Sequence, residues 1–254
     1  MSKKIAVITG ASSGMGREFV IQLCNQKQFD EVWVIARRTE RLESLGNEVT
    51  TKVRPISLDL TKRESIESYR ALLEAEKPVV DVLVNASGVG RFGTFEDMDL
   101  ESMDLMIDLN VKAYVAMTYT TLPYLQKGSE VYQLDSLSSF QPVPYICVYG
   151  ATKAFVLSFS RALNVELKKK GIHMMAVCPG WVKTEFFDHA VKDDTITYYN
   201  RFYTADQVVR RALRDMKKRK DVSVCGFQIR AQVLLTKLLP HKLVMKIWCK
   251  QQKK

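Results

Sequence analysis

Apolar residues along this chain gather in short runs, which are separated by longer stretches where they recur every three or four positions. The short runs are rich in β-branched residues and nearly continuous, which is typical of strands covered on both faces. We expect strands at Lys4–Thr9, Glu31–Ala36, Lys52–Ser57, Val80–Asn85, Glu130–Leu134, Ile172–Cys178 and Val222–Val224. The longer stretches predict helices at Gly14–Lys27, Lys62–Ala75, Leu100–Leu125, Val148–Lys169 and Thr204–Arg219.

This alternation predicts an α/β fold: a doubly wound, Rossmann-like parallel sheet of about seven strands with helices on both faces. We expect one such domain over residues 1–226, with ligands bound beyond the carboxyl ends of the strands. Residues 227–254 form a C-terminal extension in which apolar residues alternate with lysines. Its pattern breaks near Pro240 and predicts two short amphipathic helices.

Composition narrows the class of protein. The 254 residues are 46% hydrophobic, which is enough for a substantial core. No apolar run reaches the roughly 18–20 residues needed to span a bilayer, and no signal peptide is evident. We therefore expect a cytoplasmic protein. The five cysteines are dispersed and the three histidines lack metal-site spacing, so we expect reduced thiols and no metal site.

The net charge of +10 is concentrated at one end of the chain. From Arg201 onward there are 15 Lys and Arg but only 3 Asp and Glu. This basic tail could pack on its own or a partner subunit, contact an anionic membrane peripherally, or attract an acidic carrier of the substrate. No recognised nucleic-acid motif accompanies the charge, so we do not expect nucleic-acid binding.

A glycine-rich turn follows the first expected strand and opens the first expected helix. It reads Thr9-Gly10-Ala11-Ser12-Ser13-Gly14-Met15-Gly16. Glycines let the backbone approach a pyrophosphate, which the positive end of a helix attracts. The spacing differs from the commoner G-x-G-x-x-G, and a plain tight turn would need glycine too. Its position between strand and helix nevertheless favours a dinucleotide cradle.

The end of the second expected strand indicates which dinucleotide binds. NAD sites usually place an acidic residue there to hold the ribose 2′-hydroxyl. This chain instead reads Ala36-Arg37-Arg38, and a guanidinium can hold a 2′-phosphate through paired hydrogen bonds. We expect NADP(H), with Arg37 as the phosphate ligand assisted by Ser12 and Arg38. A solvated loop would also account for one of the two arginines.

Tyr149 is the candidate for proton transfer, because it alone among ten tyrosines has a lysine, Lys153, four residues on. Positions i and i+4 share one face of a helix. A phenol with its ordinary pKa of about 10 is a poor base at neutral pH. A fixed cation nearby would lower that pKa. The pair could also be an ordinary surface contact.

Together these motifs resemble the short-chain dehydrogenase/reductase family, in its single-domain form. The resemblance runs from Lys4 to about Gly226. The motifs fall in the family's order: Thr9 to Gly16, Asp59, Asn85-Ala86-Ser87-Gly88, Asn110, Ser136, Tyr149-x-x-x-Lys153, Pro179-Gly180 and Thr184.

The resemblance implies a catalytic role for four residues. Tyr149 would give a proton to the substrate oxygen in reduction and remove it in oxidation. Lys153 would lower the pKa of Tyr149 and hydrogen-bond the nicotinamide ribose. Ser136 would polarise the carbonyl, and Asn110 would hold a water that connects Lys153 to solvent.

The resemblance also implies cofactor contacts beyond the cradle. They are Asp59 and Leu60 at the adenine, Asn85, Ala86, Ser87 and Gly88 after the fourth strand, and Pro179, Gly180, Val182 and Thr184 at the nicotinamide end. Two positions depart from the family pattern. Ala86-Ser87 replaces the usual Asn-Ala, and Asp135 stands where a small residue usually precedes the catalytic serine. Strand alternation predicts that Asp135 points away from the substrate.

Residues 181–203 would form the family's mobile flap over the substrate. Aromatic residues in the flap and in the loop after Ser136 predict a pocket for a lipophilic ketone or alcohol. The candidate pocket residues are Ser136, Tyr145, Trp181, Phe186, Phe187 and Tyr199. Some of these aromatics could simply pack the flap onto the sheet.

Three functions are compatible with these observations. The first is an NADP(H)-dependent reductase of a small hydrophobic carbonyl compound, working also in the alcohol-oxidising direction. The second is a 3-oxoacyl-carrier-protein reductase, although the basic tail departs from that subgroup. The third is a catalytically silent NADP-binding regulator, against which the presence of all four catalytic residues argues. The resemblance further implies a homodimer or homotetramer through helices 100–125 and 148–169.

Overall fold

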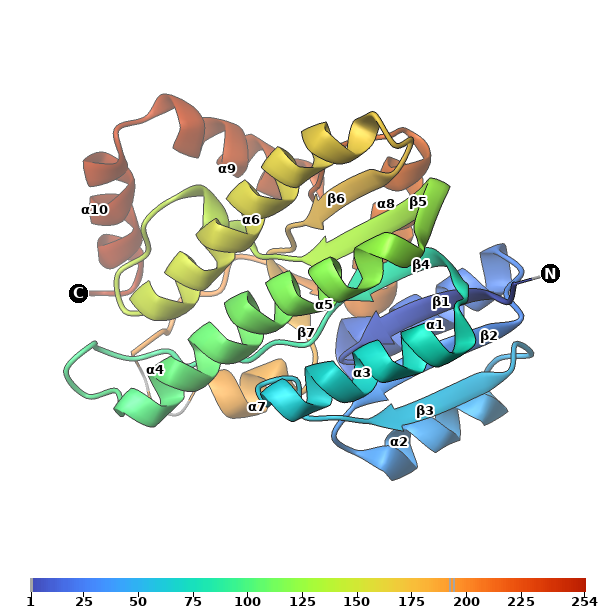
Figure 1. Ribbon diagram of the computed structural model, residues 1–254. Helices are drawn as coiled ribbons and strands as arrows, with labels where there is room; N and C mark the ends of the chain where they lie inside the picture. Colours follow the sequence, from blue (N-terminus) through green and yellow to red (C-terminus); the bar gives the residue numbers. More distant parts are fainter. Residues whose placement is uncertain (1, 192, 194) are drawn as a thin grey trace.

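The structure is a computed structural model and describes residues 2–191, 193 and 195–254. Within these residues a single large sheet of seven parallel strands runs through the centre, in the order β3-β2-β1-β4-β5-β6-β9 (Figure 1). The strands are β1 (Lys4–Thr9), β2 (Glu31–Ala36), β3 (Val53–Ser57), β4 (Val79–Asn85), β5 (Leu125–Leu134), β6 (His173–Val177) and β9 (Val222–Ser223). The expected doubly wound α/β fold is confirmed.

Both faces of the sheet are apolar, and a layer of helices covers each. Successive residues of a strand face opposite sides, so Ile5 and Val7 of β1 lie in one core and Ala6 and Ile8 in the other. The first core is closed by α3 (Arg63–Glu76), α5 (Ala113–Thr121) and α6 (Cys147–Lys168). The second is closed by α1 (Gly14–Gln26), α2 (Thr39–Glu43) and α8 (Ala205–Lys217), with η1 (Ser44–Asn47).

The direction of chain winding reverses between β1 and β4, which are neighbours in the sheet. From β1 the chain winds one way to β2 and β3, and from β4 the other way to β5 and β6. The loops after β1 and β4 therefore diverge and leave a crevice at the carboxyl edge of the sheet. The cavity described below lies at this edge.

The region expected as one helix over Leu100–Leu125 is interrupted in the structure. It consists of α4 (Leu100–Ile107), a π-helical turn η2 (Asp108–Lys112), α5, and a short 3₁₀ turn η3 (Leu122–Tyr124). Leu125 already belongs to β5. Apolar periodicity cannot distinguish a π turn from an α-helix, because it reports which positions are buried and not which backbone groups are bonded.

Two additions lie beyond the sheet. In the flap 181–203, of which residues 192 and 194 lie outside the described residues, β7 (Trp181–Lys183) and α7 (Phe186–Ala190) are followed by β8 (Phe202–Thr204). β7 and β8 pair in parallel and hold the two ends of the flap together. The C-terminal extension forms the two expected helices, α9 (Phe227–Leu238) and α10 (His241–Gln251). No helix of the described residues has both the length and the apolar character to cross a membrane.

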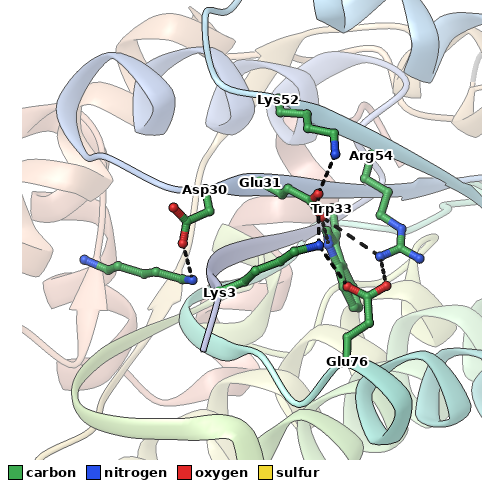
Figure 2. Close-up of polar contacts among 8 residues, drawn as sticks. Lys3, Asp30, Glu31, Trp33, Lys52, Arg54 and Glu76 are labelled. Atoms are coloured by element: carbon green, nitrogen blue, oxygen red, sulfur yellow. Dashed lines mark hydrogen bonds and ion pairs between the residues drawn. The ribbon is translucent and has the colours of Figure 1, made fainter. Parts of the chain in front are cut away.

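A charged cluster closes the amino edge of the sheet, at the opposite end from the crevice (Figure 2). Glu31, at the start of β2, is 4% exposed and accepts hydrogen bonds from Lys52 at 2.8 Å, Lys3 at 3.2 Å and the Trp33 indole at 3.2 Å. Burial alone would raise the pKa of Glu31, but these hydrogen bonds outweigh it and hold the pKa at about 2.

Candidate active site

The turn between β1 and α1 forms the cradle that the glycine spacing predicts. Gly10 has a φ of +66°, and a Cβ there would lie 2.6 Å from the carbonyl oxygen of Ala86. A Cβ at Gly16 would overlap the carbonyl group of Gly10. Glycine at both positions therefore lets three backbone segments converge where α1 begins. The positive end of the α1 dipole points to this place, so a phosphate group fits here.

A continuous cavity of about 850 Å³ runs from this cradle to the flap. Most of the predicted cofactor residues line it: Gly10, Ser12, Ser13, Gly14, Met15, Gly16, Arg37, Arg38, Asp59, Leu60, Ala86, Ser87, Gly88, Tyr149, Lys153, Pro179, Gly180, Val182 and Thr184. The residues present therefore fit a dinucleotide in an extended form, with the glycine-rich cradle at one end and the predicted catalytic side chains towards the other.

Asn85 departs from this prediction. Its side chain is 1% exposed and is not among the residues that line the cavity. Its Nδ2 atom donates to Thr118 Oγ1 at 3.1 Å and to Gln133 Oε1 at 3.0 Å, which ties β4 to α5 and β5. Asn85 is thus part of a buried polar network behind the site. The prediction was wrong because the side chain of the last strand residue points into the core.

The two arginines after β2 have different surroundings. Arg38 Nη2 donates to Ser12 Oγ at 3.1 Å and Ser13 Oγ at 3.0 Å, directly at the cradle. Its Nη1 atom pairs with Glu185 at 3.1 Å, and the neighbouring Arg41 pairs with the same carboxylate at 2.6 Å. Arg38, rather than the expected Arg37, is therefore the arginine held against the cradle.

The charge of Arg37 instead acts on Asp59, in the turn after β3. The turn is held by Asp59 Oδ1, which accepts from Thr61 Oγ1 at 2.8 Å and from Thr61 N at 3.1 Å. Burial would raise the pKa of Asp59, but these hydrogen bonds and the charge of Arg37 lower it. Asp59 therefore stays ionised and keeps the floor of the cradle in shape.

The predicted catalytic residues come together in the middle of the cavity. Tyr149 and Lys153 lie one turn apart near the start of α6, and both are at most 8% exposed. Ser136 precedes the 3₁₀ turn η4 (Leu137–Phe140) at the end of β5, and its side chain hydrogen-bonds Tyr149. Lys153 Nζ lies 5.8 Å from the centre of the Tyr149 ring and donates to the carbonyl oxygen of Leu134 at 2.8 Å.

Burial dominates the protonation of this group. It raises the pKa of Tyr149 well above the usual range, which the hydrogen bond with Ser136 opposes. Burial also lowers the pKa of Lys153. In this structure the phenol therefore stays protonated at neutral pH, and the lowering of its pKa by Lys153 that we expected is not the dominant effect.

Asn110 occupies the π turn and fastens the loop after β4. Its Oδ1 atom accepts from Val89 N at 3.0 Å, while Nδ2 donates to Val89 O at 2.8 Å and to Thr152 Oγ1 at 3.2 Å. A Cβ on Gly88 would lie 3.2 Å from Asn110 Oδ1 and 3.7 Å from Lys153 Nζ. Asn110 thus positions Gly88 beside Lys153. Its expected role in holding a water stays a prediction.

The charge of Asp135 acts on Tyr149 and Lys153, although strand alternation predicts that its side chain points away from the substrate. Its carboxylate accepts from Cys178 Sγ at 3.2 Å and is 3% exposed. Burial raises the pKa of Asp135, and the charge of Lys153 opposes that rise. In turn the Asp135 charge raises the pKa of both Tyr149 and Lys153. Asp135 also lines the cavity, so the expectation that it points away from the substrate was wrong.

An aromatic wall next to Tyr149 is formed by the flap together with Phe92, from the loop after β4. Phe92 and Phe186 lie 5.6 and 5.7 Å from the Tyr149 ring, measured between ring centres. Of the candidate pocket residues, Ser136, Trp181, Phe186 and Phe187 line the cavity. Tyr145 and Tyr199 pack behind this wall, and Tyr199 donates to Ile196 O at 3.0 Å. Their inclusion in the pocket was wrong, because aromatic content does not reveal which rings support the wall and which face the cavity.

The C-terminal extension completes the cavity, which sequence reasoning missed. Leu235, Leu239, Val244, Ile247 and Trp248 line it. Trp248 Nε1 donates to the carbonyl oxygen of Pro144 at 3.0 Å. Gln252 is buried and accepts from the backbone N–H groups of Thr197 and Tyr198, both at 2.9 Å. The signal in the sequence was Trp248, a large apolar residue within an otherwise lysine-rich helix.

Comparisons with known proteins agree with this geometry. The family model described as short chain dehydrogenase matches residues 4–195. An uncharacterised oxidoreductase of Staphylococcus epidermidis is 32% identical over 186 residues, which cover 72% of this chain and 80% of that protein. The Bacillus subtilis oxidoreductase YusZ is 31% identical over 202 residues, covering 76% of this chain and 70% of the relative.

Solved structures share this fold. A short-chain dehydrogenase from Sphingobium yanoikuyae in complex with NADPH has a TM-score of 0.79 and 27% identity, covering 91% of this chain and 90% of that chain. A serine dehydrogenase complexed with NADP⁺ has a TM-score of 0.75 and 30% identity, covering 87% and 93%. A Burkholderia phymatum enzyme in complex with NAD, at 19% identity and a TM-score of 0.79 over 92% of both chains, shares the fold.

Proposed function

Because this chain belongs to the short-chain dehydrogenase family and is an oxidoreductase, we propose that it uses NADP(H) to interconvert a lipophilic ketone or aldehyde and its alcohol. The observation that carries the proposal is the meeting of Ser136, Tyr149 and Lys153 between a phosphate cradle and an aromatic wall. Bound NADP(H) supplies the hydride. The protein supplies placement and the proton.

Tyr149 manages the proton in this proposal. Its phenol is protonated in the isolated site, so in reduction it gives its O–H proton to the substrate oxygen as negative charge develops there. Ser136 shares a hydrogen bond with the phenol and can donate to the same oxygen. Lys153, held by Leu134 O, places a cation beside the phenolate that forms.

The preference for NADP(H) rests on Arg38 and Arg41. Both guanidinium groups converge on one carboxylate, that of Glu185, where a second anion of similar geometry would find the same donors. No carboxylate follows β2 directly to hold a ribose hydroxyl, since Arg37 and Arg38 stand there. The related structures at 27% and 30% identity were solved with NADPH and NADP⁺.

The substrate class follows from the lining opposite the cradle. Phe92, Phe186 and Phe187 line the cavity together with leucine and isoleucine side chains of the tail. Such a lining favours an apolar body that carries one carbonyl or hydroxyl group. A silent regulator is disfavoured, because the four catalytic residues are present and three of them meet in the cavity.

The test is a panel of steroid ketones, 3-oxoacyl thioesters and small aldehydes, assayed by NADPH and NADH absorbance. We expect turnover of apolar carbonyl compounds, and a higher kcat/KM with NADPH that Arg38→Ala lowers by about tenfold. Tyr149→Phe should lower kcat by about 100-fold or more while cofactor binding persists. Full turnover by Tyr149→Phe would refute the proton role, and a preference for NADH would refute the cofactor assignment.

We also propose that the protein is a homo-oligomer, as the resemblance implies. Support comes from apolar side chains that α5 and α6 leave exposed, among them Tyr119, Phe155 and Val165. Phe155 and Phe159 stack at 5.9 Å on the outer surface of α6. Measurement of the solution mass by light scattering tests this proposal.

A further inference from the structure

Helix α9 presents an apolar stripe to solvent. Phe227, Ala231, Leu234 and Leu238 are spaced by four, three and four residues, which places them on one face of the helix. Phe227 is 78% exposed, Leu234 58% and Leu238 71%. The opposite face, with Ile229 and Val233, is buried against the protein. A helix that is apolar on its inner and outer faces is usually covered on both.

Basic side chains accompany this stripe. Arg230 and Lys237 are seven residues apart and flank it along one side of α9. On α10 the exposed residues Lys242, Lys246 and Lys250 follow one another at intervals of four and so form one row. Leu243 and Ile247, each 44% exposed, lie beside that row. Each tail helix therefore combines exposed apolar side chains with a row of positive charge.

Among the residues that the structure describes, these charges have no acidic partner within ion-pair distance. Residues 222–254 contain seven Lys and Arg and no Asp or Glu. In the part of the chain that the structure describes, the preceding helix α8 pairs Arg210 with Asp206 and Arg211 with Asp215, whereas Arg230 and the α10 row form no ion pair. Like charges at i and i+4 destabilise an isolated helix. The row thus suits an external anionic surface.

We propose that α9 and α10 together form a membrane-binding surface, composed of Phe227, Leu234 and Leu238 with Arg230, Lys242, Lys246 and Lys250. The apolar stripe enters the boundary between headgroups and acyl chains of an anionic bilayer, and the basic side chains contact lipid phosphates. Figure 1 shows the two helices at one corner of the molecule, beyond the edge of the sheet.

The occupant is a membrane rather than a second copy of this chain. Two copies of this surface would bring positive charges together without a single carboxylate between them. A stable protein interface also needs about 800 Å² from each partner, which one stripe of four side chains does not provide. An anionic bilayer can pair its phosphates with the basic side chains and bury the apolar side chains in the same contact.

The cavity connects with this surface. Leu235 and Ile247 line the cavity, yet they are 54% and 44% exposed, so the wall made by the tail reaches solvent. Membrane binding would therefore place this wall next to the lipid. The binding itself does not depend on the proposed substrate, so the two proposals can fail separately.

The test is co-sedimentation of the full chain with two kinds of vesicle. One is made of phosphatidylcholine alone, and the other of phosphatidylcholine and phosphatidylserine in equal parts. We expect binding to the anionic vesicles alone, weakened by added salt. The triple variant Lys242→Gln/Lys246→Gln/Lys250→Gln should bind about 100-fold more weakly. The matched control Lys168→Gln/Lys169→Gln/Lys170→Gln removes the same charge from the exposed end of α6 and should bind like the unchanged protein.

The apolar stripe is tested separately with Leu234→Ser/Leu238→Ser, which should weaken vesicle binding by at least about tenfold. The circular dichroism spectrum and the midpoint of thermal unfolding should be unchanged in all variants, which shows that they fold whatever the substrate is. The proposal is overturned if anionic vesicles do not sediment the protein, or if the α6 control loses binding as strongly as the α10 variant. It is also overturned if the stripe variant changes only the solution mass, which would identify a second copy as the occupant.

Discussion

Asp135 places a buried negative charge beside the two residues that would move the proton. Because a negative charge makes it harder for neighbouring groups to lose a proton, Asp135 raises the pKa of both Tyr149 and Lys153. The carboxyl group ionises before the phenol, since its pKa, although raised by burial, lies below the raised pKa of the phenol. Asp135 is therefore charged over the range in which Tyr149 titrates.

Replacing Asp135 with Asn should shift the pH profile of alcohol oxidation towards lower pH by about one unit. Oxidation needs phenolate, and removal of the buried charge lowers the pKa at which phenolate forms. The profile of kcat/KM against pH measures this shift. The matched variant Cys178→Ala removes the partner of Asp135 but keeps its charge, and should leave the profile in place. A shift of the Asp135→Asn profile towards higher pH would contradict this account.

At the residue scale, the sequence predicted what local spacing determines. Tyr149 and Lys153 share a helix, so four positions of separation were enough to bring them together. Arg38, Asn85 and Tyr145 were misjudged because their environments depend on partners far along the chain. Arg38 meets Ser12, and Asn85 meets Gln133 on a different strand. Tyr145 has a φ of +67°, a conformation that no local sequence pattern predicted.

At the scale of elements, α10 is fastened to the flap by one buried side chain. Gln252, just beyond the end of α10, accepts from two backbone N–H groups of the flap and donates to Tyr198 O at 3.3 Å. Each such hydrogen bond contributes about 0.5–1.5 kcal/mol net. The tail and the flap should therefore open together.

Gln252→Ala should release the flap. We expect faster hydrogen exchange at the amides of Thr197 and Tyr198, and a severalfold higher KM for carbonyl substrates with little change in the KM for cofactor. Exchange followed by mass spectrometry, together with steady-state kinetics, measures both effects. Gln228→Ala, at an exposed position of α9, is the control and should change neither. Unaltered exchange in the Gln252 variant would show that other contacts hold the flap.

The long strands and helices were predicted well because each carries a strong apolar period. The short elements were not. β7 and β8 have three residues each, too few for alternation to be visible, and they exist because the chain returns to pair with itself. The π turn over Asp108–Lys112 was hidden for another reason. It accompanies the hydrogen bonds between Asn110 and Val89, which only the tertiary structure supplies.

At the scale of the molecule, the candidate active site and the charged cluster around Glu31 lie at opposite edges of the sheet. The cavity lies at the carboxyl edge, whereas the Glu31 cluster closes the amino edge (Figure 2). The order of strands explains why the position of the site was predictable, since a doubly wound sheet opens where its winding reverses. The cluster was not predicted, because it joins residues from four separate segments.

Acid should destabilise the protein through Glu31. Its folded pKa of about 2 lies below its ordinary value of 4.5, so its stabilising contribution is complete above about pH 4.5 and is lost as the pH falls towards 2. Glu31→Gln should lower the free energy of unfolding at neutral pH by about 1–2 kcal/mol and weaken this acid dependence. Urea unfolding at several pH values measures both effects. Glu96→Gln, in an exposed loop, is the control, and an equal loss there would remove Glu31 from this role.

The carboxylate of Glu185, in the flap, competes with any anion in the cradle for the same two arginines. Arg38 and Arg41 now hold that carboxylate, and a 2′-phosphate would draw on the same guanidinium hydrogens. Reciprocity then applies: to whatever extent the phosphate loosens Glu185, a displaced Glu185 strengthens phosphate binding by the same free energy. Binding of a 2′-phosphate would thus weaken the contact between the arginines and the flap, and release of Glu185 would strengthen phosphate binding, in whichever order the two events occur.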